Sequence, residues 1–139
     1  MSYSSCTEEC YDSKVTVKEN RSRFVLNNES RYKVLRTKVD GCFIQGHEER
    51  CDWLLSTDQP EKMAYLVELK GKDIDKAISQ LSATLDKLPQ SLASHKKICV
   101  AVTTRIPKYG PSMRKKYEDF MRRNGVKLTV KNSNYEVSL

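Results

Sequence analysis

Two residues of complementary chemistry, Glu68 and Lys70, lie two positions apart in a segment with the composition of a β-strand. Side chains two apart on a strand point to the same face of the sheet, so the carboxylate and the ammonium are expected side by side. Tyr65, Val67 and Leu69 alternate with them and are expected to face apolar surroundings. Such a stiff element could hold a metal ion and the water that attacks a substrate.

A second carboxylate lies upstream in a segment that also predicts a strand. Residues 51–55 are apolar, rich in strand-forming types and include Asp52. Residues 56–63 predict a turn, so the two strands would pair as a hairpin with Asp52 beside Glu68. Two carboxylates held close together repel, and a shared proton or a divalent cation relieves this repulsion. Mg²⁺ prefers oxygen ligands, and Lys70 would orient or help deprotonate a water on the ion.

These residues and the helix predicted after them resemble the PD-(D/E)xK nuclease superfamily, which has the restriction-endonuclease-like fold. Asp52 matches the first acidic residue, and Glu68-Leu69-Lys70 matches the E-x-K element. Strand, hairpin, E-x-K strand, helix and buried strand follow in the order of that fold over about residues 34–130. The resemblance implies an α/β fold with a central mixed β-sheet flanked by helices.

The same resemblance implies a Mg²⁺-dependent endonuclease or phosphodiesterase, with Mn²⁺ as an alternative ion. Asp52, Glu68 and the backbone carbonyl of Leu69 would hold the metal. Lys70 would position the attacking water. In several branches of the superfamily a glutamine on the following helix assists the site, and Gln80 is the residue we nominate here.

The sequence departs from the superfamily pattern in two places. Cys51 stands where the name of the superfamily implies a proline. A clear acidic residue on an N-terminal helix is missing, and Glu29 and Asp40 are the candidates for this third acid.

The clearest predicted element is the helix after the E-x-K strand. Asp73 suits its N-cap, apolar residues recur on one face from Ile74 to Leu88, and Pro89 closes it. Residues 98–102 are almost unbroken apolar and predict a buried strand parallel to the E-x-K strand. Further strands are predicted at residues 23–26, 33–39 and 126–130, the last as an edge strand.

A second helix, predicted over residues 111–124, has a strongly basic outer face. With the segment that leads into it, this helix supplies candidate phosphate contacts at Arg105, Lys108, Arg114, Lys115, Arg122 and Arg123. Its expected inner stripe is Met113, Tyr117, Phe120 and Met121. A merely solvated basic face is the alternative interpretation.

The charge balance points to a polyanionic partner. The 139 residues include 25 Lys and Arg against 18 Asp and Glu, a net charge of +7. We expect nucleic acid, with DNA ranked above RNA. Two copies associated through the edge strand at residues 126–130 would place one metal site on each strand of a duplex, so a homodimer is considered.

Neither a signal-peptide pattern nor a stretch of membrane-spanning length is visible, so we expect a cytoplasmic protein without membrane association. The odd count of five cysteines then predicts free thiols. The spacing of Cys42, His47 and Cys51 fits no common zinc pattern, and a fourth ligand is missing. Residues 1–20 are polar and predict a loose N-terminal arm or a short surface element, ahead of a single nuclease-like domain at residues 21–139.

Two other interpretations of the carboxylates stay open. Glu68 and Lys70 could form an exposed ion pair, which would contribute only about 0–1 kcal/mol to stability, with Asp52 a solvated residue at a strand edge. Alternatively, the chain could be a non-catalytic nucleic-acid-binding or protein-binding module on the same fold, for example a regulatory protein in defence or phage biology. The apolar neighbours of both carboxylates favour burial at a functional site.

Overall fold

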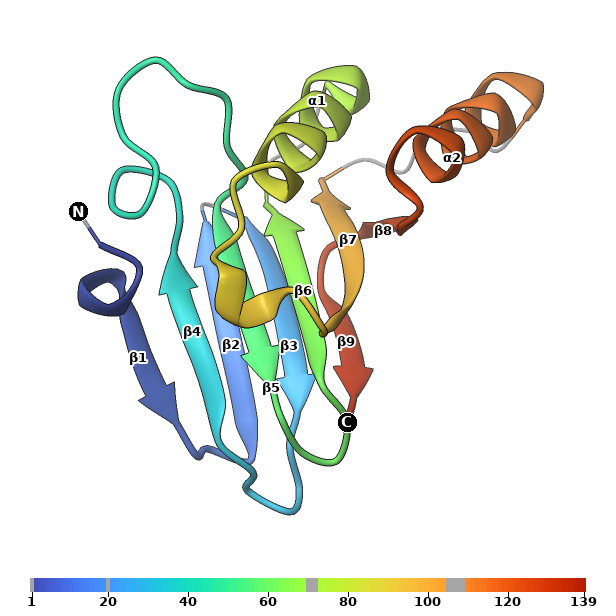
Figure 1. Ribbon diagram of the computed structural model, residues 1–139. Helices are drawn as coiled ribbons and strands as arrows, with labels where there is room; N and C mark the ends of the chain where they lie inside the picture. Colours follow the sequence, from blue (N-terminus) through green and yellow to red (C-terminus); the bar gives the residue numbers. More distant parts are fainter. Residues whose placement is uncertain (1, 20, 70–72, 105–109) are drawn as a thin grey trace.

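The computed structural model describes residues 2–19, 21–69, 73–104 and 110–139, and it has an α/β architecture (Figure 1). Within these residues the larger sheet has the strand order β1-β4-β5-β6-β7-β8, and a smaller sheet has the order β2-β3-β9. The larger sheet consists of β1 (Thr7–Cys10), β4 (Val34–Lys38), β5 (Trp53–Thr57), β6 (Met63–Glu68), β7 (Lys96–Thr103) and β8 (Lys127–Asn132). The smaller sheet consists of β2 (Lys14–Glu19), β3 (Ser22–Asn27) and β9 (Tyr135–Ser138). The helices are α1 (Ile74–Leu85) and α2 (Pro111–Asn124), and short 3-10 turns lie at Ser4–Cys6 and Gln90–Leu92.

The larger sheet is mixed, as predicted. Strands β4, β5 and β6 form an antiparallel meander, whereas β6, β7 and β8 run parallel to one another. Helix α1 connects β6 to β7 and α2 connects β7 to β8, which is the crossover that parallel neighbours require. The predictions of a β5–β6 hairpin, of a β6–α1–β7 crossover and of an edge strand at β8 are therefore confirmed.

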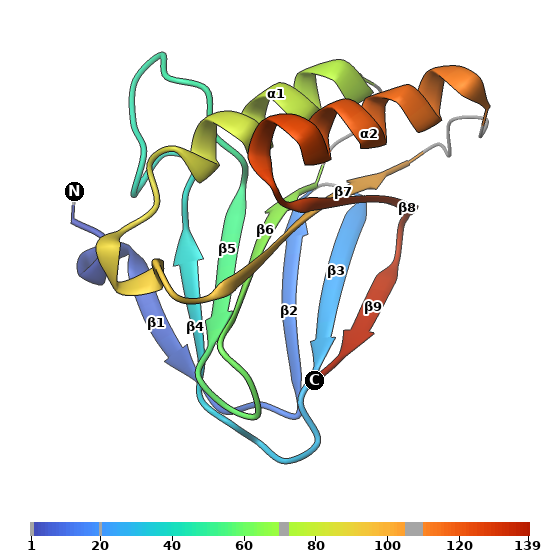
Figure 2. The ribbon, with the colours of Figure 1, turned by 45° about the vertical axis from the view of Figure 1, so that its right-hand side comes forward.

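The two helices lie side by side on one face of the larger sheet (Figure 2). Their apolar sides pack with one set of sheet residues, including Leu54, Leu66 and Ala101. The opposite face, with Leu55, Tyr65 and Val67, packs on the smaller sheet through Val15, Val17, Phe24 and Leu26. Among the described residues, helices therefore flank only one face of the larger sheet. The alternating apolar residues of β2 and β3 cover its other face.

The helix ends follow the residues that predicted them. The side chain of Asp73 accepts a hydrogen bond from the Lys76 N–H at 3.0 Å and caps α1. Pro111 occupies the first turn of α2, and Gly125 ends that helix with a φ of 64°, which a glycine adopts without steric cost. One part of the predicted inner stripe of α2 is wrong, because the Met121 side chain is 48% exposed.

The prediction of a loose arm at residues 1–20 is wrong for the described part of that segment. Strand β1 pairs with β4, β2 pairs with β3, and a disulfide joins Cys6 to Cys42. The expectation of free thiols is therefore wrong for these two cysteines, and the disulfide also takes Cys42 out of any zinc site. Free thiols remain at Cys10, Cys51 and Cys99, and all of them are buried.

Candidate functional site

Asp52 and Glu68 lie at the same end of the β5–β6 hairpin. The regular ladder ends with the pair Trp53–Val67, so Asp52 precedes β5 and Glu68 ends β6. The pairing is irregular at Asp52, because its N–H donates to the carbonyl of Val67, the partner of Trp53. Glu68 shares its face of the sheet with Leu66, two residues earlier, which belongs to the core beneath the helices. Asp52 is only 2% exposed and Glu68 only 1%, which contradicts the alternative of an exposed Glu68 and a solvated Asp52.

Hydrogen bonds fix the position of Asp52 against both of its neighbouring segments. Its Oδ2 accepts the backbone N–H of Leu69 at 2.8 Å, and its own N–H donates to the Val67 carbonyl at 3.1 Å. On the other side, its backbone carbonyl accepts the N–H of Val39 at 3.0 Å. The carboxylate is therefore held in one orientation by the E-x-K strand, while the rest of the β4–β5 loop (residues 39–52) approaches it from β4.

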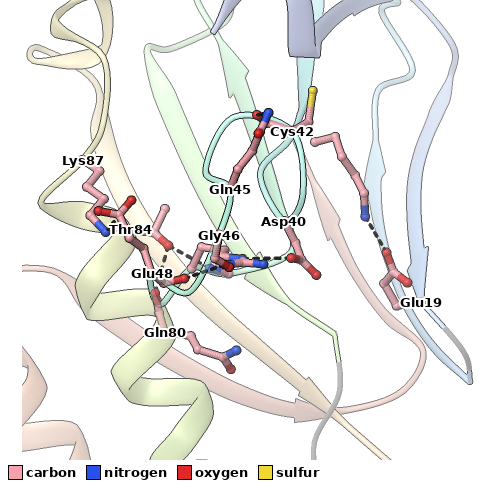
Figure 3. A network of polar contacts seen from close by, with 12 residues as sticks. Glu19, Asp40, Cys42, Gln45, Gly46, Glu48, Gln80, Thr84 and Lys87 are labelled. Atoms are coloured by element: carbon pink, nitrogen blue, oxygen red, sulfur yellow. Dashed lines mark hydrogen bonds and ion pairs between the residues drawn. The ribbon is translucent and has the colours of Figure 1, made fainter. Parts of the chain in front are cut away.

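Thr84, on the last turn of α1, connects that helix to the residue before Asp52. Its Oγ1 accepts the backbone N–H of Cys51 at 2.8 Å and donates to the Gln80 carbonyl at 2.9 Å (Figure 3). The Thr84 side chain is fully buried. The structure thus gives this helix residue a supporting contact with the loop that precedes Asp52. Gln80 itself is half-buried one turn earlier.

Cys51, at the position where the superfamily name has proline, lies among these groups. Burial raises the pKa of its thiol, and the nearby charges of Glu68 and Asp52 raise it further, whereas the contact with Thr84 lowers it. The thiol is thus protonated at ordinary pH. Cys51 therefore packs as a neutral, fully buried group in the core beneath the helices.

The structure separates the two candidates for a third acidic residue. Asp40 lies in the β4–β5 loop beside the backbone of Asp52, and its Oδ1 accepts a hydrogen bond from Arg50 Nε at 2.9 Å (Figure 3). Glu29 lies in the connection between β3 and β4, at the end of β4 remote from Asp52. Of these two residues, only Asp40 is near the site, and there it forms an ion pair with Arg50.

A further charged pair lies at the same end of the larger sheet but on its other face. Lys38 Nζ contacts Glu19 Oε1 at 2.9 Å (Figure 3). It also lies 4.9 Å from the centre of the Trp53 ring. Glu19 comes from β2, in the segment that the sequence had assigned to a loose arm. No local signal in the sequence links β2 to β4, so this pair was missed.

The carboxylates at this end of the hairpin are oxygen ligands of the kind that a hard cation such as Mg²⁺ binds. Among the described residues no cluster of three or more His, Cys, Asp or Glu could hold a metal. Asp52 and Glu68 nevertheless supply two buried carboxylates at one end of the hairpin. Mg²⁺ is commonly bound through one or two carboxylates with water completing its shell, so the oxygen ligands of these two residues are of the type that Mg²⁺ or Mn²⁺ would need. Lys70 lies outside the described residues.

The basic face of α2 is partly neutralised within the helix itself. Lys115 and Arg122 both form ion pairs with Asp119, at 3.4 Å and 2.6 Å. Arg114 and Arg123 are exposed, and no ion pair is seen for either within the described chain. These two arginines are thus the better phosphate-contact candidates on this helix. The remaining candidates, Arg105 and Lys108, lie outside the described residues.

None of the helices in the described ranges combines the length and the apolar character needed to cross a membrane. Comparison of the chain with family models, with curated proteins and with solved structures gives no match.

Proposed function

We propose that the protein is a Mg²⁺-dependent nuclease that hydrolyses phosphodiester bonds of nucleic acid. The observation that supports this most strongly is the placement of Asp52 and Glu68, which are both almost fully buried at the same end of one hairpin. Burying two carboxylates is costly for the fold alone, and a cation bound by them would remove that cost. The net charge of +7 fits a polyanionic substrate.

In this proposal each residue has one task. Asp52, oriented by the Leu69 N–H, and Glu68 would hold the cation together with the Leu69 carbonyl. When bound, the ion would polarise the scissile phosphate and lower the pKa of a coordinated water. Lys70 would orient the attacking water, and Gln80 would assist from α1. Arg114 and Arg123 contact phosphates outside the site.

The test is cleavage of labelled single-stranded and duplex DNA and RNA with Mg²⁺, with Mn²⁺ or with EDTA. Glu68→Gln and Asp52→Asn should each lower the rate at least about 100-fold, because each removes a charged ligand while keeping the shape of the side chain. Lys70→Met should lower the rate similarly and still bind metal. Glu61→Gln is the matched control, since Glu61 is exposed at the opposite end of the same hairpin.

Calorimetry with Mn²⁺ separates binding of the metal from turnover. Wild-type protein should bind the ion, and Asp52→Ala should not. Unchanged cleavage in Glu68→Gln would remove the proposed site. Folded wild-type protein that binds oligonucleotides but cleaves none of the substrates with either metal would instead support the non-catalytic module.

A further inference from the structure

The outer edge of β8 is the most distinctive surface away from the carboxylates. In the described part of the chain β8 pairs only with β7, so its other edge is open. In Figure 2, β8 runs beneath α2 and leads into β9. A groove of about 480 Å³ follows this edge and is lined by Tyr117, Met121, Tyr135 and residues 127–131 of β8.

The backbone of β8 determines which groups point into the groove. The N–H of Ser133, just after β8, donates to the carbonyl of Thr103 on β7 at 2.9 Å. Along a strand, the backbone N–H and C=O groups of successive residues point alternately to one neighbouring strand and to the other. Every second residue before Ser133 therefore also turns these groups toward β7, namely Lys127, Thr129 and Lys131. The groups of Leu128 and Val130 therefore point to the open edge, where another extended chain could pair with them.

The two walls of the groove differ in chemistry. On the helix side lie Tyr117 and Met121, and the Met121 side chain is almost half exposed. On the other side lie the exposed Lys127 and Lys131, with Lys131 Nζ 5.9 Å from the centre of the Tyr135 ring. Within the described residues no carboxylate lines the groove. One wall is thus apolar, and the other is positively charged and aromatic.

The charges of β8 favour an acidic segment over a second copy of the chain. A two-fold antiparallel pairing of β8 with itself, centred on Thr129, would place Lys127 of each copy directly opposite Lys131 of the other. Like charges at directly opposed positions destabilise a strand pair. The two lysines therefore disfavour a homodimer paired in this register, and they favour an occupant with negative charge.

We propose that β8 binds an extended segment of a partner protein in which apolar and acidic residues alternate. Pairing with the outward groups of Leu128 and Val130 would extend the larger sheet by one strand. Alternate side chains of that segment would then face Met121 on the helix side and the two lysines on the other side. This interaction is independent of the proposed nuclease activity.

The probe is a fluorescein-labelled peptide of six residues, the length of β8, in which valine and glutamate alternate. Its binding to the full chain is followed by fluorescence anisotropy. Lys127→Glu combined with Lys131→Glu should weaken binding by about tenfold or more, from the loss of two exposed ion pairs and their replacement by repulsion. Lys18→Glu combined with Lys33→Glu changes the net charge equally at exposed sites in β2 and just before β4, which are not adjacent to β8, and should leave binding unchanged.

Amide hydrogen exchange distinguishes strand addition from simple charge attraction. Saturating peptide should slow exchange at Leu128 and Val130, while Thr129, which already faces β7, should change little. Equal weakening by the control pair of variants would overturn the proposal, as would equal binding of a peptide with its valines and glutamates in separate blocks. Absence of protection at Leu128 and Val130, or preferential displacement of the peptide by a single-stranded oligonucleotide, would overturn it as well.

Discussion

Replacing Thr84 by valine tests the contact that supports the Asp52 end of the hairpin. Valine keeps the shape of the side chain but cannot accept the Cys51 N–H, which is now bound at 2.8 Å in a fully buried position. A buried backbone donor left without an acceptor costs about 1–3 kcal/mol. The second bond of Thr84, to the Gln80 carbonyl, adds little, because that carbonyl lies within α1 and keeps its place in the helical ladder.

We therefore expect Thr84→Val to lower the free energy of unfolding by about 1–3 kcal/mol. For a chain of this size that corresponds to about 3–5 °C in Tm for each kcal/mol. Urea denaturation measures the first quantity. Hydrogen exchange at the Cys51 amide localises the effect, since this amide should lose protection more strongly than the strand amides around it.

Thr84→Ser is the control, because it keeps the hydroxyl and removes one methyl group. It should cost about 0.5–1.5 kcal/mol, in the range of other single-methyl deletions in a core, and leave the Cys51 amide protected. If Thr84→Val unfolds within about 0.5 kcal/mol of the wild type, as neutral surface substitutions do, the hydroxyl does not hold Cys51 and the reasoning fails.

Other perturbations have equally specific outcomes. Asp52→Ala should be about 1–3 kcal/mol less stable than Asp52→Asn in urea with EDTA, because only asparagine can still accept the Leu69 N–H; equal stabilities would contradict this. Burial raises the pKa of the Cys99 thiol from 9.0 to about 12, so the native state favours the neutral thiol. Its contribution to stability is complete below pH 9 and is lost as pH rises toward 12, by up to about 1.4 kcal/mol per pH unit; Cys99→Ala should show a shallower decline over this range. Replacing Cys6 and Cys42 by serine removes a disulfide between residues 36 positions apart and should lower the free energy of unfolding by about 2–4 kcal/mol. Reduced wild-type protein should then unfold at the same urea concentration as this variant.

The β5–β6 hairpin could be predicted because the signals for it are local. The turn between β5 and β6 sets the register, and the alternation of apolar residues along β6 fixes the face on which Glu68 lies. Likewise, Asp73 and Gly125 carry their capping roles in their own chemistry. These elements need little information from the rest of the chain.

Contacts between distant segments could not be predicted in the same way. Strand β1 is short and polar because only part of an edge strand faces the core, so its sequence resembles a loop. The Cys6–Cys42 disulfide depends on β1 lying beside β4. Thr84 and Cys51 are 33 residues apart, and a threonine on a helix is usually solvated, so its buried role is visible only once α1 is docked on the sheet.

The pairing of β3 with β9 has a consequence for the kinetics of folding. These strands join residues 109 apart, as in the hydrogen bond from Asn27 Nδ2 to Glu136 Oε1, whereas β1 and β4 join residues about 30 apart. Closing the longer loop costs about 1 kcal/mol more in chain entropy, and pairings of such sequence separation slow folding. We expect the hairpin that carries Asp52 and Glu68 to form early, and the smaller sheet to close last over the apolar face of a sheet that is already assembled.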